Sequence, residues 1–182
     1  MKRRRIPIFL LALLLLSLTG CQSAAPKPYA YLDDSFSAEL SGMLYSQAFT
    51  LKLTVTKDAP KGTASPTYSV TAEHLSPSPF APLRLSAVLD QEGNAIGEVA
   101  LTYGELHTTV SADTLTGLLC PIRALLVRKE TVSVQKEGDV YRFVLENGAT
   151  VVRNSDGYPL AFSSPDLSFS VVWWETEQKA EG

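Results

Sequence analysis

Hydrophobic and polar residues alternate along most of the chain from Ser35 onward. Between Phe49 and Thr56, for example, apolar residues occupy every second position, and threonine and lysine lie between them. Because successive side chains of a strand point to opposite faces, this pattern predicts a strand with one buried and one solvated face. Alternation of this kind is typical of antiparallel strands, whereas parallel sheets have continuous apolar runs. The pattern recurs at residues 36–40, 68–72, 83–89, 99–103, 106–110, 141–145 and 167–173.

Turn sequences separate these segments. Gly93, Gly138, Gly148 and Gly157 each lie among polar residues between two predicted strands. Asn-Gly and Asp-Gly favour tight hairpins because these residues tolerate positive φ. One connection differs, since residues 76–82 contain three prolines, which exclude a central strand. The spacing of the turns predicts a meander of about ten or eleven strands.

The segment Ser111–Val127 has helical periodicity instead. Its leucine and isoleucine residues recur every three or four positions, so that one face of the helix is apolar. Ser111 is placed to cap this helix, and Pro121 is expected to kink it or split it in two because proline lacks an amide donor. The predicted fold class is therefore mainly β (α+β): a curved antiparallel meander or half-barrel of about 10–11 strands, with one helical lid segment at about 112–127.

The first twenty residues have the three-part plan of an export signal. A cationic start at Lys2–Arg5 precedes an apolar run from Ile6 to Leu16, and small or polar residues follow. The end of this segment, Leu18-Thr19-Gly20-Cys21, resembles the lipobox of bacterial lipoproteins. That resemblance implies that Cys21 is acylated with chains such as palmitate and becomes the first residue of the mature chain. The alternative is a plain secretory signal with a chance cysteine near the cleavage site.

Four regions follow from these features. We expect a signal peptide at 1–20, a lipidated Cys21 and short tether at 21–34, a β domain at 35–175 and a polar tail at 176–182. The formal net charge of −3 conceals this division, because residues 1–20 hold four of the sixteen basic residues and none of the nineteen acidic ones. The remainder carries twelve basic and nineteen acidic residues, a net charge of −7. Nucleic-acid binding is not expected, because it needs basic residues concentrated on the folded domain.

Several features of the chain occur together: the lipobox, the long strands at 36–40 and 49–55, the break at Leu75-Ser76-Pro77, the central apolar helix, and Asp156-Gly157-Tyr158-Pro159-Leu160 before the last strand. In these features the chain resembles the superfamily of bacterial lipoprotein-localisation factors, the LolA and LolB type. The resemblance implies a half-barrel of about eleven strands lidded by helices, and a hydrophobic ligand or lipidated client. The chain departs from that pattern in its first segment, where Tyr29–Asp34 is too short for the usual opening helix. A β-sandwich and a closed lipocalin-like barrel are alternative folds.

No motif indicates an enzyme, a metal site or a cofactor. The chain lacks a nucleophile elbow, a zinc-protease motif, a P-loop and a dinucleotide fingerprint. His74 and His107 are expected to be half-exposed strand residues, and Cys120 a small buried hydrophobic residue without a base nearby. Neither catalytic residues nor cofactors are therefore predicted, and a hydrolase is kept only as a third hypothesis.

The predicted binding site is an apolar cavity between the curved sheet and the helix. Its candidate residues are Leu115, Leu118, Leu119, Ile122, Leu125 and Leu126 of the helix, with Phe49, Leu51 and Leu53 of a strand. The alternative is that the same side chains simply fill the core.

The expected function is that of a non-enzymatic envelope lipoprotein that binds a hydrophobic ligand. Its partners would be a membrane, through the lipid on Cys21, and a ligand or an envelope protein. It would lie on the extracytoplasmic face of the cell membrane, or on the outer membrane of a cell with two membranes, because Gln22 is not an aspartate retention signal. The alternative function is a structural or protein-interaction module. For such a module Trp173 is expected on the core face and Trp174, with Val172, on the outer face.

Overall fold

The computed structural model describes residues 25–27, 29–58, 65–76 and 82–176 of the chain. The predicted signal peptide, Cys21, most of the proline-rich loop and the polar tail from residue 177 lie outside the described residues. No helix in the described part of the chain is long and apolar enough to cross a membrane.

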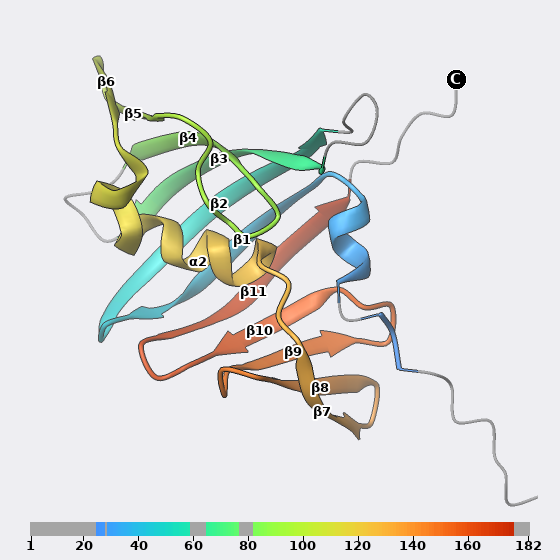
Figure 1. Ribbon diagram of the computed structural model, residues 1–182. Helices are drawn as coiled ribbons and strands as arrows, with labels where there is room; N and C mark the ends of the chain where they lie inside the picture. The colour runs from blue at the N-terminus through green and yellow to red at the C-terminus, as the bar shows by residue number, and fades with distance from the viewer. Residues whose placement is uncertain (1–24, 28, 59–64, 77–81, 177–182) are drawn as a thin grey trace, which may run out of the picture.

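In this part of the chain eleven antiparallel strands form one curved sheet (Figure 1), which confirms the mainly β prediction. Eight of them coincide with the segments of alternating residues, and β7, β9 and β10 are additional. The strands are β1 (Phe36–Leu44), β2 (Gln47–Asp58), β3 (Thr67–Ser76), β4 (Leu83–Leu89), β5 (Val99–Tyr103), β6 (Leu106–Val110), β7 (Thr131–Glu137), β8 (Val140–Leu145), β9 (Thr150–Asn154), β10 (Pro159–Ser163) and β11 (Leu167–Thr176).

The strand order explains how a simple meander becomes one wide sheet. Neighbours along the sheet run β6-β5-β4-β3-β2-β1-β11-β10-β9-β8-β7, so the first and last strands pair at its centre. Phe36 of β1 lies opposite Thr176 of β11, and Leu44 lies opposite Leu167. In the described residues β6 and β7 are the two free edges, so the sheet is neither a closed barrel nor a pair of stacked sheets.

The alternating residues determine which face of the sheet is buried. In β2 the side chains of Phe49, Leu51, Leu53 and Val55 are buried, and those between them are exposed or only partly buried. The hairpins turn where the sequence predicts, and Gly138 and Gly148 have φ values of 64° and 79°. These φ values lie in the left-handed region, which a side chain disfavours.

The predicted lid segment is helical and connects the two edge strands. A 3-10 helix, η2 (Ala112–Leu115), leads into the α-helix α2 (Thr116–Leu126), which lies over the concave face of the sheet (Figure 1). The Ser111 side chain makes no capping hydrogen bond, contrary to the expectation. The helix is also not split at Pro121, because α2 continues through it. The carbonyl that loses its partner is that of Gly117, and Gly117 is exposed, so water can satisfy it.

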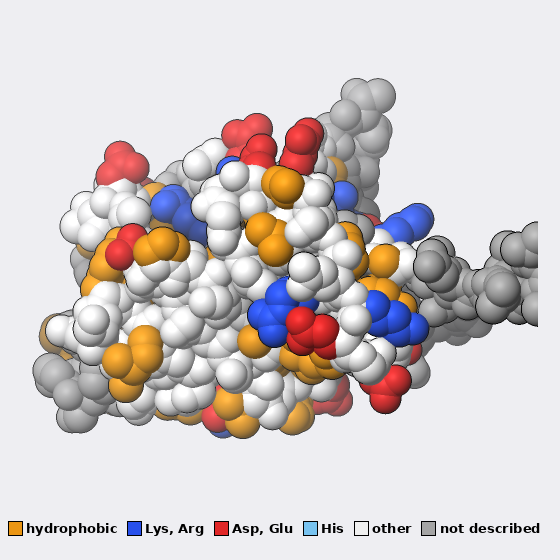
Figure 2. Space-filling view, turned by 90° about the horizontal axis from the view of Figure 1, so that it is seen from below, with side chains coloured by type: hydrophobic (Ala, Val, Ile, Leu, Met, Phe, Trp, Pro, Cys, Tyr) orange, Lys and Arg blue, Asp and Glu red, His pale blue; other side chains and the backbone are white. Residues whose placement is uncertain are grey.

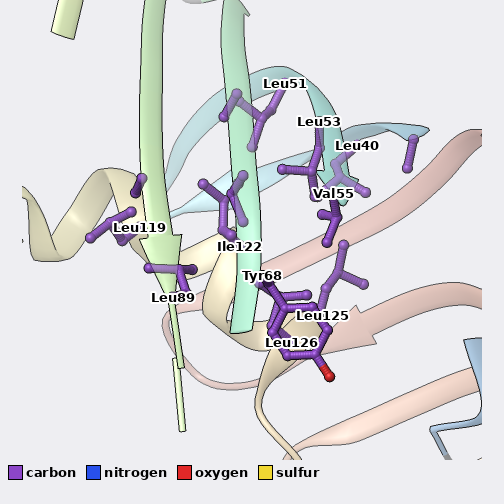
Figure 3. Packing of buried hydrophobic residues seen from close by; sticks show 14 of the residues in the cluster. Leu40, Leu51, Leu53, Val55, Tyr68, Leu89, Leu119, Ile122, Leu125 and Leu126 are labelled. Carbon is purple, nitrogen blue, oxygen red and sulfur yellow. The ribbon is translucent and has the colours of Figure 1, made fainter. Parts of the chain in front are cut away.

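The leucine face of α2 and the concave face of the sheet form one core. Side chains from β1 to β4 and from α2 point toward one another in Figure 3, where Leu53, Val55, Tyr68, Ile122 and Leu125 lie close together. A short 3-10 helix before β1, η1 (Ala30–Asp33), adds to this core. Its Tyr31 and Leu32 are buried, so the predicted tether is folded onto the domain before Asp34.

The prediction for the tryptophan pair is wrong in its assignment of faces. The two residues do point to opposite faces, but Trp174 lies inside, with its ring stacked 4.2 Å from that of Phe36, and Trp173 is 47% exposed. The reason is a β-bulge, because Ala38 and Glu39 pair with Trp174 and Trp173 whereas Leu40 pairs with Val171. The extra residue in β11 reverses the alternation for the rest of the strand.

Candidate functional site

The concave face of the sheet is covered unevenly. The large core cluster joins α2 to β1–β5 and to the start of β11, and a separate cluster lies on β8 and β9 with Phe162 of β10 packed against it. The smaller cluster consists of Tyr141, Phe143, Leu145, Ala149 and Val151. No residue of α2 belongs to it, so the helix covers one half of the face better than the other.

A pocket of about 320 Å³ lies between the second half of α2 and the strands of the smaller cluster. Its apolar walls include Ala124, Val127, Leu145, Phe162 and Leu167. A pocket of this size is near the lower end of the ~300–1,000 Å³ that small-molecule sites occupy. We call it the α2 pocket.

Polar groups border the α2 pocket on both sides. Glu92, Lys129 and Asn147 are exposed and line it, and Arg123 is half-buried. The Arg123 Nε donates a hydrogen bond to the Gly93 carbonyl at 2.8 Å, which ties α2 to the loop after β4. The pocket therefore combines apolar walls with charged groups where it meets solvent.

The nine predicted cavity residues come together as one packed cluster. Eight are buried, and Leu118 packs against their margin. Phe49 and Leu118 also line a small pocket of about 90 Å³ near His74. Between α2 and β1–β4 the side chains lie against one another, as Figure 3 shows.

Sequence reasoning missed the residues that line the α2 pocket. Cys120, Ala124 and Val127 lie at spacings of four and three residues, so they form a second stripe beside the leucine stripe of the helix. This stripe was detectable in the sequence, because its side chains are smaller than leucine and leave space beside the helix. The contributions of Leu145 and Phe162 were not detectable, because they depend on how the distant strands curve.

Cys120 is half-buried in the wall of this pocket, so it is less buried than predicted. Burial raises the pKa of its thiol, against the nearby Arg123 guanidinium, which lowers it. A raised pKa reduces the thiolate fraction and hence the nucleophilicity of the sulfur.

His74 is buried, not half-exposed as predicted. Its side chain lies on the inward face of β3 with those of Tyr68, Val70 and Ala72, and only 5% of it is exposed. Burial lowers the pKa of His74, so the neutral imidazole is favoured. Its Nε2 has no hydrogen-bond partner among the described residues.

Arg153 is the buried charge of the concave face. Only 1% of it is exposed, and its guanidinium carbon lies 4.8 Å from the ring centroids of both Tyr29 and Tyr31 and 5.5 Å from that of Phe143. In the described part of the chain it forms no ion pair, although its Nη1 donates to the Gly157 carbonyl at 3.5 Å. Burial lowers the pKa of Arg153, and the two tyrosines raise it. The three rings thus take the place of a counterion and close this end of the concave face.

The two histidines lie on different strands of the sheet. His107 lies on exposed strand β6, where its Nδ1 is 3.0 Å from the Thr102 Oγ1, and His74 is on β3. Within the described ranges no three His, Cys, Asp or Glu residues lie close enough to hold a metal ion.

Comparison of the chain with protein-family models, with curated proteins and with solved structures finds no match. The geometry of the α2 pocket is therefore the starting point for a functional proposal.

Proposed function

We propose that this protein is a membrane-anchored lipoprotein of the bacterial envelope that binds a hydrophobic ligand without catalysing a reaction. The fold would be a half-barrel of the LolA and LolB type, and the ligand, or an acyl chain of a lipidated client, would occupy the α2 pocket. The observation that carries the proposal is the pocket itself, an apolar space of about 320 Å³ beside a helix that covers only part of the concave face.

The residues that line the pocket favour a ligand that is mostly apolar. Phe162 offers apolar surface from the sheet, and Ala124 and Val127 offer it from the side of the helix, while Leu145 and Leu167 line the pocket but are almost fully buried. Burial of apolar surface contributes about 25 cal/mol per Å², so a ligand gains affinity mainly by covering these side chains. The charged residues at the border would contact the polar end of such a ligand.

Filling the pocket tests the proposal. The Ala124→Trp variant places an indole where the ligand would lie, so we expect the affinity for a fluorescent fatty acid to fall about tenfold or more. The matched control is Ala100→Trp on the exposed side of β5, which should bind as the wild type does. Thermal unfolding of both variants checks that the fold is retained.

Two results would refute the ligand proposal. One is equal binding by the wild type and Ala124→Trp. The other is the absence of co-purified lipid in native mass spectrometry of the wild type together with no saturable binding of the fluorescent fatty acid.

The membrane anchor is proposed on the lipobox alone. Two or more acyl chains hold a protein stably on a bilayer, whereas a single chain exchanges. We expect Cys21→Ser to move the protein from the membrane fraction to the soluble fraction. A Cys21→Ser protein that stays fully with the membrane would contradict the lipid anchor.

A protein-interaction module is the second candidate, and the free edges of the sheet favour it. Among the described residues, strands β6 and β7 have no neighbour on one side, and they expose Leu106 by 73% and Val132 by 70%. An exposed edge can bind an extended peptide as an additional strand. A photo-crosslinker placed at Leu106 or at Val132 in cells should then capture a partner protein at the edge that binds it, and no capture at either edge would count against this function.

A further inference from the structure

The start of the described chain identifies the end of the sheet nearest to Cys21. Residues 25–27 run beside the turn between β9 and β10, where a Cβ added to Gly157 would lie 3.4 Å from the Pro26 Cβ. The segment enters this turn region before it continues into η1 (Figure 1). The start of the described chain therefore lies beside the turn at residues 154–158.

An apolar surface lies at this same end, on the convex face of the sheet. Val172 is 61% and Trp173 is 47% exposed, and Leu160 of β10 is also exposed. These three side chains line one hollow of about 520 Å³, together with Tyr158 of the turn. We call the three residues the outer patch.

Irregular strand pairing creates the outer patch. The β-bulge in β11 turns Val172 and Trp173 outward, and the pairing of β10 with β9 shifts between Pro159 and Ala161, where Leu160 lies. Bulges redirect side chains and are usually specific features of a sheet. Without them, Trp173 would continue the inward series of Phe169 and Val171.

The length of the intervening chain places the outer patch close to any bilayer that holds Cys21. Pro26 lies five residues after Cys21, and a fully extended chain spans at most about 18 Å over those five steps. The headgroup layer on each side of a bilayer accounts for roughly 5–7 Å of its thickness. The turn beside Pro26 therefore cannot move far from the membrane surface.

The charges around the outer patch favour a zwitterionic membrane surface over an anionic one. Glu39 lies opposite Trp173 in the register, with Lys52 opposite Glu39 on β2, and Glu175 is exposed two residues further along β11, so two carboxylates and one ammonium group lie beside the patch. An anionic surface would repel these two carboxylates, whereas a zwitterionic surface presents ammonium groups to them. Tryptophan is enriched in the headgroup region because its ring is amphipathic.

We propose that Leu160, Val172 and Trp173 form a contact surface for the zwitterionic headgroup region of the bilayer in which Cys21 is anchored. The contact orients the domain, with the convex face at the β10–β11 end toward the lipid. This inference rests on the proposed lipid anchor, but it is independent of the ligand in the α2 pocket.

Quenching of tryptophan fluorescence by brominated lipid tests the contact. The full-length lipoprotein is reconstituted in phosphatidylcholine vesicles that contain brominated chains, and flotation first shows whether it is bound. The difference between the wild type and Trp173→Phe gives the signal of Trp173, and we expect the lipid to quench roughly half of it or more. Replacing much of the phosphatidylcholine by anionic phosphatidylglycerol should reduce that quenching.

A second reporter measures orientation. Tyr45 is exposed at the turn after β1, at the opposite end of that strand from Phe36. In the Trp173→Phe, Tyr45→Trp protein the new indole should stay in water, and brominated lipid should not quench it.

The outcomes separate this inference from the anchor on which it rests. Bound protein with an unquenched Trp173, or with equal quenching at positions 45 and 173, overturns the contact surface and leaves the anchor standing. Quenching that rises with phosphatidylglycerol overturns the preference for a zwitterionic surface. Wild-type protein that does not float overturns the anchor, and the contact with it.

Discussion

The hydroxyl of Tyr31 links η1 to the end of α2, and its removal has a consequence that depends on pH. The Tyr31 hydroxyl donates a hydrogen bond to the Leu125 carbonyl at 2.5 Å, and the ring packs edge-on against Phe36 and Trp174. Tyr31→Phe keeps the ring and deletes the hydroxyl, which leaves the Leu125 carbonyl without this donor. We expect the variant to be less stable by about 1–2 kcal/mol near pH 8.

The difference between the two proteins should shrink as the pH rises. Burial raises the pKa of Tyr31 to about 12, against the Arg153 guanidinium, which lowers it. The unfolded chain releases this proton near pH 10, before the folded protein does, so the stability that neutral Tyr31 contributes is present below pH 10 and is lost between pH 10 and about 12. A rise of two in the pKa corresponds to roughly 3 kcal/mol of stability, which exceeds the about 1–2 kcal/mol that the hydrogen bond contributes. The phenylalanine variant should therefore overtake the wild type toward the upper end of this range.

Urea unfolding at a series of pH values from about 8 to about 11.5 measures this effect. The free energy of unfolding of the wild type should fall more steeply above pH 10 than that of Tyr31→Phe. Tyr45→Phe, at an exposed tyrosine, is the matched control and should retain the wild-type slope. Parallel curves for the wild type and Tyr31→Phe would show that Tyr31 ionises as readily in the folded protein as in the unfolded chain.

Two further pairs of substitutions test the packing of the central strands. A Cβ on Gly42 would overlap the Ser168 carbonyl oxygen and lie 2.6 Å from the Phe169 Cα, so Gly42→Ala should lower the free energy of unfolding by about 2 kcal/mol or more. Gly117 lies in open space on α2, so Gly117→Ala should raise the free energy of unfolding by up to about 1 kcal/mol. Trp174→Ala should cost about 3 kcal/mol and Trp173→Ala less than about 1 kcal/mol, as measured by urea unfolding, because only Trp174 packs in the core. Equal costs within either pair would contradict the assigned packing.

Most of the fold follows from local patterns in the chain. Alternation in β2 determines its buried face, because one residue of slippage would expose Leu51 and Leu53 together. The helix is predictable for a similar reason, since residues 115–126 place their leucines on one side. The short strands β9 and β10 are harder to detect, because Val151-Val152 and Leu160-Ala161-Phe162 are adjacent apolar residues and not an alternation.

The features that depend on strand pairing could not be predicted. The bulge in β11 lies within an unbroken run of strand-forming residues, so no local signal shows that Trp173 points outward and Trp174 inward. Arg153 likewise resembles an ordinary solvated strand residue in the sequence. It is buried because η1, from the other end of the chain, brings Tyr29 and Tyr31 over it.

A comparison of lengths explains why the protein has space beside its helix at all. The eleven residues of α2 extend about 16 Å, whereas eleven strands spaced about 4.8 Å apart extend roughly 48 Å along the curve of the sheet. One helix of this length cannot cover such a face in any orientation. The rest must be covered by other parts of the chain, as η1 and Arg153 do at one end, or stay open, as at the α2 pocket. Lengthening α2 by two turns with leucine at inward positions would therefore cover more of the face and abolish ligand binding, if binding depends on that space.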